Sequence, residues 1–129
     1  MEFPKDLMHT DNDERIRVEG TTGTVGITDY AQDQLSDVVY VELVVSEDEV
    51  VAQGDTCATI ESVKAAADVY MPVSGKIIAT NEELADTPEL VNSEPHGAAW
   101  LVKLEMSDSS ELEGLMDAAA YEKFTAEKN

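Results

Sequence analysis

The stretch of sequence that decides the fold is residues 54–77, GDTCATIESVKAAADVYMPVSGKI. Two arms of residues, 56–61 and 67–71, lie on either side of Lys64. Alternating β-branched and apolar residues in these arms are typical of strands. We therefore expect a β-hairpin with residues 62–65, Ser-Val-Lys-Ala, at its tip.

The hairpin arms carry turn residues at similar distances from the tip. Gly54 lies ten residues before Lys64, and Gly75 lies eleven residues after it. This near symmetry predicts turns at matching heights on the two arms. Two β-rich halves related in this way can close into a flattened barrel or sandwich, so the sequence predicts a mainly β fold.

Strand and turn residues continue on both sides of this hairpin. Before the central hairpin we expect another hairpin within residues 15–30, followed by a short helix over 30–35 that Thr28 or Asp29 caps. A buried strand at 38–45 and an acidic loop at 46–49 come next. After the central hairpin we expect a long loop at 82–95 with one helical turn, and then a strand at 98–106 in which Trp100 anchors the core.

The last part of the chain is predicted to be helical. Ser110 and Glu113 fit a capping box, and Asp117 is placed to cap a second helix running to Phe124. An apolar stripe accompanies these signals and consists of Leu112, Leu115, Met116, Ala119 and Tyr121.

Length and charge limit the possible functions. The 129 residues suit one domain over residues 1–129, with a core at about 14–106 and a helical tail at 107–129. The net charge of −20, with eight Lys and Arg, argues against nucleic acid as a partner because phosphate binding needs clustered cations. No apolar run approaches the roughly 20 residues that cross a membrane. The negative field repels further copies, so we expect a monomer.

Few residues suit metal binding or catalysis. Cys57 is the single cysteine, which excludes an internal disulfide, and we interpret it as a buried strand residue rather than a reactive thiol. His9 and His96 are far apart in sequence without cysteine partners, so we expect neither a metal site nor a catalytic triad. The N-terminus lacks the pattern of a secretory signal and is too acidic for a transit peptide.

Lys64 is the residue that its neighbours single out. A lysine at a hairpin tip is ordinarily a solvated surface residue. Here three alanines, residues 65–67, follow it and leave the amine unshielded, while Glu61 and Asp68 flank the tip. Two strand arms would hold the tip rigidly away from the body. A modifying enzyme requires an exposed and geometrically fixed amine of this kind.

Residues 61–77 resemble the lipoylation segment of the glycine cleavage H-protein family. The similarity extends to residues 24–32, 90–95, 100–103 and 112–121, and so covers the chain from about residue 14 to 124. By this resemblance, Lys64 carries covalent lipoic acid, and the modification motif around it consists of Glu61, Ser62, Val63 and Ala65. The implied fold is the hybrid barrel-sandwich of lipoyl and biotinyl hairpin domains, with short C-terminal helices.

The resemblance implies a carrier that catalyses no step itself. In that family the lipoyl group receives the aminomethyl group of glycine from a pyridoxal-phosphate-dependent glycine decarboxylase (P protein) and delivers it to a tetrahydrofolate-dependent aminomethyltransferase (T protein). Dihydrolipoamide dehydrogenase (L protein) then reoxidises the dithiol. A lipoate ligase or a lipoyl/octanoyl transferase would load Lys64. The implied compartment is the bacterial cytoplasm, or the mitochondrial matrix after removal of a transit peptide.

Glu14 and Asp68 are further candidates by the same resemblance. The family lays its amine-bearing arm in a cleft of the carrier, and these two carboxylates occupy matching positions, where they would attract the cationic amine. The chain departs from the family pattern at residues 13–15, Asp-Glu-Arg, where His-Glu-Trp is common. It also has Ser36 where the family has a glycine suited to unusual backbone angles.

Two other interpretations remain open at this point. A biotinyl carrier domain also uses a hairpin lysine, but such domains typically place methionine on both sides of it, and here the flanking residues are Val63 and Ala65. An H-like paralogue that is not modified would instead act as a binding module or in lipoate relay.

Overall fold

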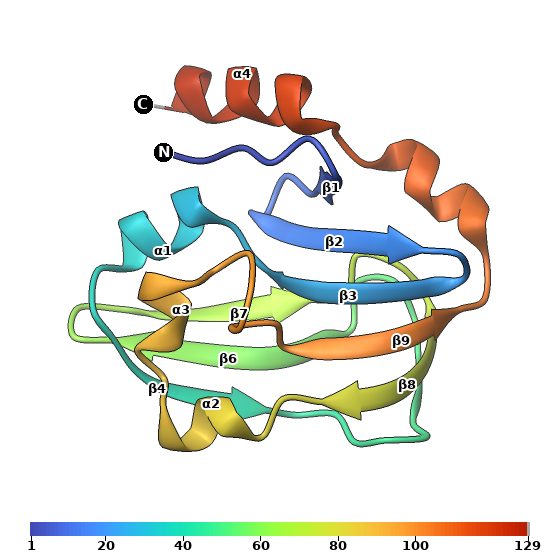
Figure 1. The fold of residues 1–129 in the computed structure, drawn as a ribbon, viewed down its shortest axis with the longest axis horizontal. Helices are drawn as coiled ribbons and strands as arrows, with labels where there is room; N and C mark the ends of the chain where they lie inside the picture. The colour runs from blue at the N-terminus through green and yellow to red at the C-terminus, as the bar shows by residue number, and fades with distance from the viewer. Residues whose placement is uncertain (129) are drawn as a thin grey trace.

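The computed structural model describes residues 1–128 and consists of two antiparallel sheets with short helices (Figure 1). The strands are β1 (Leu7–His9), β2 (Glu14–Glu19), β3 (Thr22–Ile27), β4 (Val38–Leu43), β5 (Val50–Val51), β6 (Thr56–Ser62), β7 (Ala66–Tyr70), β8 (Gly75–Thr80) and β9 (Val102–Met106). The helices are α1 (Asp29–Leu35), α2 (Glu83–Asp86), α3 (Leu90–Ser93), the 3-10 helix η1 (Ser109–Gly114) and α4 (Ala118–Lys128).

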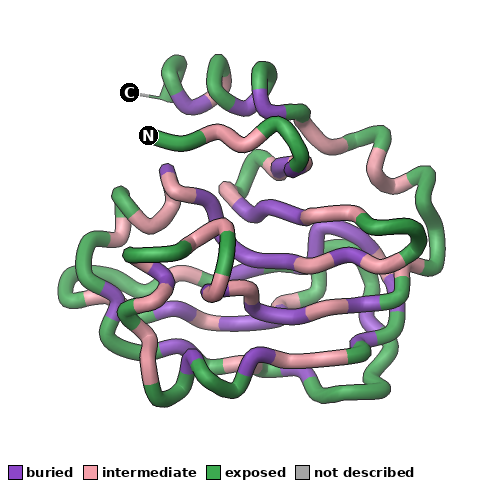
Figure 2. Tube along the Cα trace, viewed as in Figure 1, coloured by how far each residue is buried: buried purple, intermediate pink, exposed green. Residues whose placement is uncertain are grey.

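The two sheets share one hydrophobic core. One sheet has the strand order β1-β2-β3-β9-β8-β5, and the other has the order β4-β6-β7. Buried segments run along the strands of both sheets (Figure 2). The core cluster draws side chains from each sheet, among them Ile16, Val25, Leu104, Val41, Ile60 and Val69. The predicted mainly β barrel-sandwich is therefore confirmed.

The β2–β3 hairpin and α1 form where the sequence predicts them, whereas strand β1 lies outside the predicted elements. Gly20 adopts φ 65° in the tight turn between β2 and β3, a conformation that glycine enters without steric cost. Thr28 caps α1 because its Oγ1 accepts a hydrogen bond from the backbone N–H of Ala31 at 3.0 Å. α1 thereby begins directly after β3 and leads into β4.

The two glycines of the hairpin arms have different roles, which corrects the predicted symmetry. Gly54 lies in a turn with φ 92°. Gly75 is instead the first residue of β8, where a Cβ atom would lie 2.2 Å from the carbonyl oxygen of Glu105 on β9. The second glycine therefore permits close approach of two strands, and the chain bends earlier, at Pro72 and Val73.

The prediction that Trp100 anchors the core is wrong. β9 begins only at Val102, and Trp100 precedes it as a half-buried residue with the Lys103 Nζ 4.8 Å from its ring centroid. Ala99 and Leu101 are buried instead. The alternation predicted from Val102 onward is confirmed, because Val102 and Leu104 are both buried.

The C-terminal prediction needs two corrections. The cap of η1 is Asp108, whose Oδ1 accepts from the Ser110 N–H at 3.0 Å, so the predicted capping box at Ser110 and Glu113 does not form. The apolar stripe is also not one helix face, since the chain runs extended through Met116 between η1 and α4. The Asp117 cap is confirmed, and α4 continues beyond Phe124 to Lys128.

The N- and C-terminal segments are joined by contacts that no local sequence pattern indicates. Met116 forms a β-bridge with His9 through two backbone hydrogen bonds of 2.8 Å. The His9 ring stacks on that of Tyr121 with centroids 4.4 Å apart and planes inclined by 2°. α4 consequently lies over the N-terminal segment, and the N-terminus is on the same side of the molecule as α4 (Figure 1).

Candidate functional site

Lys64 lies at the tip of the β6–β7 hairpin, between Ser62 and Ala66. Ser62 closes this tip: its backbone N–H donates to the Ala65 carbonyl at 2.7 Å, and its Oγ accepts from the N–H groups of Lys64 and Ala65 at 3.3 and 3.1 Å. A serine hydroxyl that binds backbone groups two and three residues later stabilises a turn. Ser62 therefore fixes the backbone that carries Lys64.

A second contact ties the tip to the neighbouring strand. The Val63 N–H donates to the Asp37 carbonyl at 3.0 Å, directly before β4 begins. The tip is thus held by hydrogen bonds that involve only backbone groups and the Ser62 hydroxyl. None of these bonds uses the Lys64 side chain.

The Lys64 amine is free and accessible. Lys64 is exposed, as are Ala65 and Ala66, and its Nζ makes no ion pair within residues 1–128. Glu61 and Asp68 are exposed as well, and the Asp68 carboxylate accepts from the Thr59 hydroxyl at 3.1 Å rather than from Lys64. The tip therefore presents a primary amine without a competing carboxylate partner.

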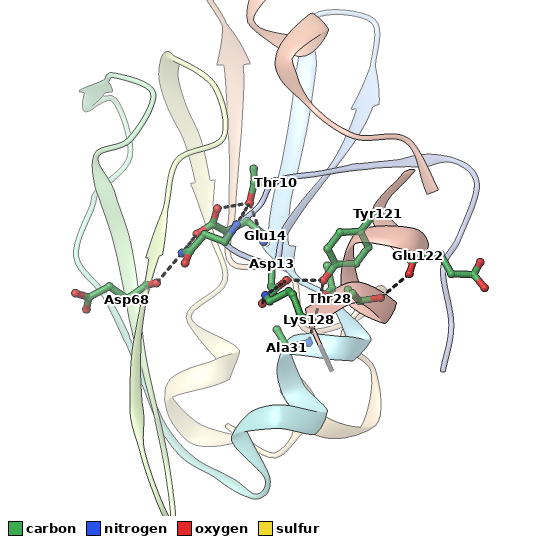
Figure 3. A network of polar contacts seen from close by, with 11 residues as sticks. Thr10, Asp13, Glu14, Thr28, Ala31, Asp68, Tyr121, Glu122 and Lys128 are labelled. Atoms are coloured by element: carbon green, nitrogen blue, oxygen red, sulfur yellow. Dashed lines mark hydrogen bonds and ion pairs between the residues drawn. The ribbon is translucent and has the colours of Figure 1, made fainter. Parts of the chain in front are cut away.

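Glu14 is buried, in contrast to Asp68 (Figure 3). Its carboxylate accepts hydrogen bonds from the Thr10 hydroxyl at 2.6 Å, from the Asn12 side-chain amide at 2.5 Å and from the Tyr70 backbone N–H at 3.0 Å. Burial raises the pKa of Glu14 above its usual value, and these three donors oppose that shift. Glu14 thus joins the start of β2 to the end of β7.

The structure places Glu14 and Asp68 beside two different cavities. Glu14 lines a cavity of about 450 Å³ with Tyr70 and Met116, whereas Asp68 lines a cavity of about 180 Å³ with Asp13. Asn12 lines both cavities, and its side-chain amide donates to the Glu14 carboxylate and to the Asp68 carbonyl, the latter at 3.4 Å. The two predicted cleft residues are therefore connected through Asn12 and do not share one pocket.

Asp13 belongs to a polar network beside the smaller cavity (Figure 3). The Tyr121 hydroxyl donates to Asp13 Oδ1 at 3.0 Å and lies 2.6 Å from the Thr28 hydroxyl. The Lys128 ammonium lies 3.1 Å from Asp13 Oδ2. These contacts hold α4 against the start of α1 and the start of β2, and Asp13 is the member of the network that lines the cavity.

Sequence reasoning missed Thr10, Asn12 and Tyr121 as part of this region. Thr10 and Asn12 alternate with Glu14, and short polar side chains before a strand are typical of turns in which side chains bind backbone groups. This signal was available in the sequence. Tyr121 was assigned to an apolar stripe, and its hydroxyl partners follow only from the tertiary structure.

Arg15 is a fully buried cation. Its Nε and Nη2 donate to the Pro95 carbonyl at 3.2 and 2.8 Å, while its Nη1 has no hydrogen-bond partner among residues 1–128. Burial lowers the pKa of Arg15 to about 10. The guanidinium lies so close to Gly26 that a Cβ there would be 2.7 Å from Nη2. Arg15 therefore ties the loop before β9 to the β2–β3 hairpin.

Cys57 has the environment of a core residue. It is fully buried on β6, and burial raises the pKa of its thiol to about 12. Within residues 1–128, no three His, Cys, Asp or Glu residues are grouped so as to hold a metal ion. The same residues include no helix that is both long and apolar enough to span a membrane.

Comparison with known proteins identifies the family. The sequence pattern of the family described as glycine cleavage H-protein matches residues 7–128. The chain belongs to the glycine cleavage H-protein family. This confirms the resemblance found around Lys64.

Individual H proteins agree with that assignment along nearly their whole length. The glycine cleavage system H protein of Halothermothrix orenii is 50% identical over 98% of this chain and 98% of that protein. The H protein of Staphylococcus saprophyticus is 48% identical over 98% of this chain and all of that protein. The crystal structure of a glycine cleavage system H protein from Mycobacterium marinum superposes with a TM-score of 0.83 at 30% identity, covering 97% of this chain and 98% of that chain.

Proposed function

We propose that this protein is the lipoyl carrier of a glycine cleavage system and that lipoic acid is attached to the Nζ of Lys64. Membership of the H-protein family supports the carrier role. The observation that carries the site assignment is the free, exposed amine at a hairpin tip whose backbone is closed by Ser62 and tied to Asp37. Residues Glu61, Ser62, Val63 and Ala65 then form the segment that a modifying enzyme contacts.

The residues at the tip fit the attachment of a long acyl group. Formation of the amide neutralises Lys64, and no ion pair or hydrogen bond among residues 1–128 is lost because its Nζ makes none with them. When bound, the lipoyl group supplies a dithiolane that accepts and releases a one-carbon unit and is reoxidised by thiol–disulfide chemistry. The protein holds the tether at a fixed point, which raises the effective concentration of the arm at a docked enzyme to the order of millimolar.

The further assignments belong to the same proposal. The chain is one carrier domain and a monomer in the bacterial cytoplasm, and it catalyses no step. Its partners are glycine decarboxylase, aminomethyltransferase, dihydrolipoamide dehydrogenase, and the ligase or transferase that loads Lys64. The high identity to H proteins over nearly the full length supports this set of partners.

Glu14 and Asp68 are proposed to hold the amine of the loaded arm. The smaller cavity is lined by Ala67 and Asp68, which follow Lys64 on β7, so an arm that folds back along this strand reaches it. Asn12 separates this cavity from the buried Glu14 carboxylate. A cationic amine that reaches either carboxylate gains a charge-assisted hydrogen bond with it.

Lys64→Arg tests the attachment site. The variant should fold normally and gain no lipoyl mass when incubated with a lipoate ligase, lipoic acid and ATP, because arginine offers no amine for amide formation. Intact mass and peptide mapping measure the increment. Lys123→Arg, on the exposed face of α4, is the matched control and should be lipoylated as the wild type is. Lipoyl mass on the Lys64→Arg protein would refute the assignment.

Glu14→Gln and Asp68→Asn test the cleft. Each replacement keeps the side-chain volume and removes a negative charge, so the loaded carrier should lose its aminomethyl group about tenfold faster, as expected for one charged hydrogen bond. The rate of ammonia release from isolated loaded protein measures the effect. Glu105→Gln is a surface control on β9 that should decay at the wild-type rate. Equal decay in all proteins would remove both residues from the cleft.

A further inference from the structure

The outer face of the β4–β6–β7 sheet is uncovered and leads directly to Lys64. The register places Tyr40 opposite Glu61, and Glu42 opposite Thr59. These residues point away from the core, since their neighbours Val41 and Ile60 are buried. Outward residues of all three strands therefore form one continuous surface that ends at the hairpin tip.

A β-bulge enlarges the apolar part of this surface. The register shifts between Val38 and Tyr40, which leaves Val39 as the extra residue. Val39 and Tyr40 are both exposed, at 53% and 46%, and Val63 at the tip is 67% exposed. Three large apolar side chains are thus presented to solvent beside the lysine, and nothing within residues 1–128 covers them.

The charged residues of the same face are all acidic. Its acidic residues are Glu42, Glu61 and Asp68, all exposed, and the strands β4, β6 and β7 contain no lysine or arginine. We call the surface formed by Val39, Tyr40, Glu42, Glu61, Val63 and Asp68 the hairpin face. An apolar patch with acidic neighbours is complementary to a partner whose surface is apolar at its centre and cationic around it.

We propose that the hairpin face is the docking surface for the enzyme that acylates Lys64. This inference rests on the proposed function and specifies the partner of its site. The Lys64 amine stands on a four-carbon stem, so an active site that reaches its Nζ must contact the residues around the tip. An enzyme that acts at the far end of the attached lipoyl arm can stand away from this face. Because the hairpin face adjoins the amine, its position points to the acylating enzyme as its partner.

The test compares two double variants that have the same change in charge and that each replace an exposed large hydrophobic residue with serine. Tyr40→Ser/Glu42→Lys alters the hairpin face away from the tip. Glu47→Lys/Val50→Ser is the matched control, because Glu47 is exposed in the loop after β4 and Val50 is 78% exposed on β5. Thermal unfolding of both proteins establishes that each is folded.

The measurement is the initial rate of lipoyl transfer by a bacterial lipoate ligase with lipoic acid and ATP, followed by intact mass. The reaction forms the amide at Nζ and yields AMP and pyrophosphate. At about 50 mM salt, the face variant should lose about tenfold in kcat/KM while keeping its kcat, and the control should stay near wild type. The deficit should shrink in about 0.5 M salt because part of it is electrostatic.

The outcomes separate this inference from the proposed function. Equal kcat/KM for the face variant and the control, with wild-type protein lipoylated on Lys64, would overturn the docking surface alone. A loss confined to kcat would also overturn it, since docking is expressed in KM. Failure of the wild type to be lipoylated on Lys64 would overturn the proposed function itself.

A second assay tests whether glycine decarboxylase, rather than the acylating enzyme, binds the hairpin face. The face variant, once fully lipoylated at high ligase concentration, should support glycine decarboxylase turnover at the wild-type rate. Normal lipoylation kinetics combined with lost decarboxylase turnover would assign the hairpin face to the decarboxylase and would overturn the inference.

Discussion

His9→Phe is predicted to remove much of the acid sensitivity of the fold. His9 is 1% exposed, and its ring stacks on Tyr121 where the N-terminal strand meets the segment before α4. Burial lowers the pKa of His9 to about 4, with smaller contributions from His96 and Arg15, while a hydrogen bond to the Met116 backbone and the charge of Asp117 oppose the shift. Phenylalanine retains the aromatic stack and cannot be protonated.

The sign and size of the effect follow from proton linkage. The unfolded chain binds a proton at His9 near pH 6.5, whereas the folded protein binds it only near pH 4. Stability from the neutral ring is therefore complete above pH 6.5 and is lost as the pH falls toward 4. The full loss is about 3 kcal/mol, and about 2 kcal/mol of it occurs between pH 7.5 and pH 5.

Urea unfolding of both proteins at pH 7.5 and pH 5 measures the effect. The free energy of unfolding should fall by about 2 kcal/mol more in the wild type than in His9→Phe. The pKa values of His96 and Glu14 are also shifted in the folded protein. Both groups are present in the wild type and in His9→Phe, so their contributions to the pH dependence cancel in this difference. A difference in pH response below about 0.5 kcal/mol would refute the assignment of this proton to His9.

Two further predictions concern stability. Tyr121→Phe removes the hydroxyl that binds Thr28 and Asp13, and should lower the free energy of unfolding by about 2 kcal/mol in urea. Tyr40 is an exposed tyrosine, so Tyr40→Phe is the control and should change the free energy of unfolding by less than about 0.5 kcal/mol. Ser36→Gly should raise the free energy of unfolding by about 1 kcal/mol in thermal unfolding, because Ser36 adopts φ 68° and ψ −149°, a region that glycine enters without strain. Ser36→Ala keeps the Cβ and should give no gain.

Local signals predicted the parts of the fold in which neighbours in sequence are also partners in space. The β6–β7 hairpin brings its own arms together, so the strand pattern and the position of Lys64 at the tip followed from residues 54–77 alone. The Thr28 cap is likewise a contact over three residues. The serine in place of glycine at position 36 even marked a residue that has positive φ in the structure.

Contacts between distant segments explain what the sequence did not reveal. The apolar neighbours of Met116 fit a helical stripe and predict a helix there, but Met116 pairs with His9 through a backbone bridge that no local pattern encodes. Trp100 was placed in the core from its alternation with Val102, yet the strand begins only at Val102. Family resemblance groups Glu14 with Asp68, and the structure places them beside two cavities that share Asn12, an arrangement between distant segments that no local pattern encodes.

The arrangement at the hairpin tip separates stability from function. Every hydrogen bond that fixes the tip uses a backbone group or the Ser62 hydroxyl, and none uses the Lys64 ammonium. Acylation of Lys64 would change the net charge from −20 to −21 by removing one cation, and it would break no hydrogen bond or ion pair within residues 1–128. The hydrogen bonds and ion pairs of residues 1–128 are therefore the same whether the amine is free or acylated. This independence suits a carrier, because the tether point stays fixed while the attached group moves among partners.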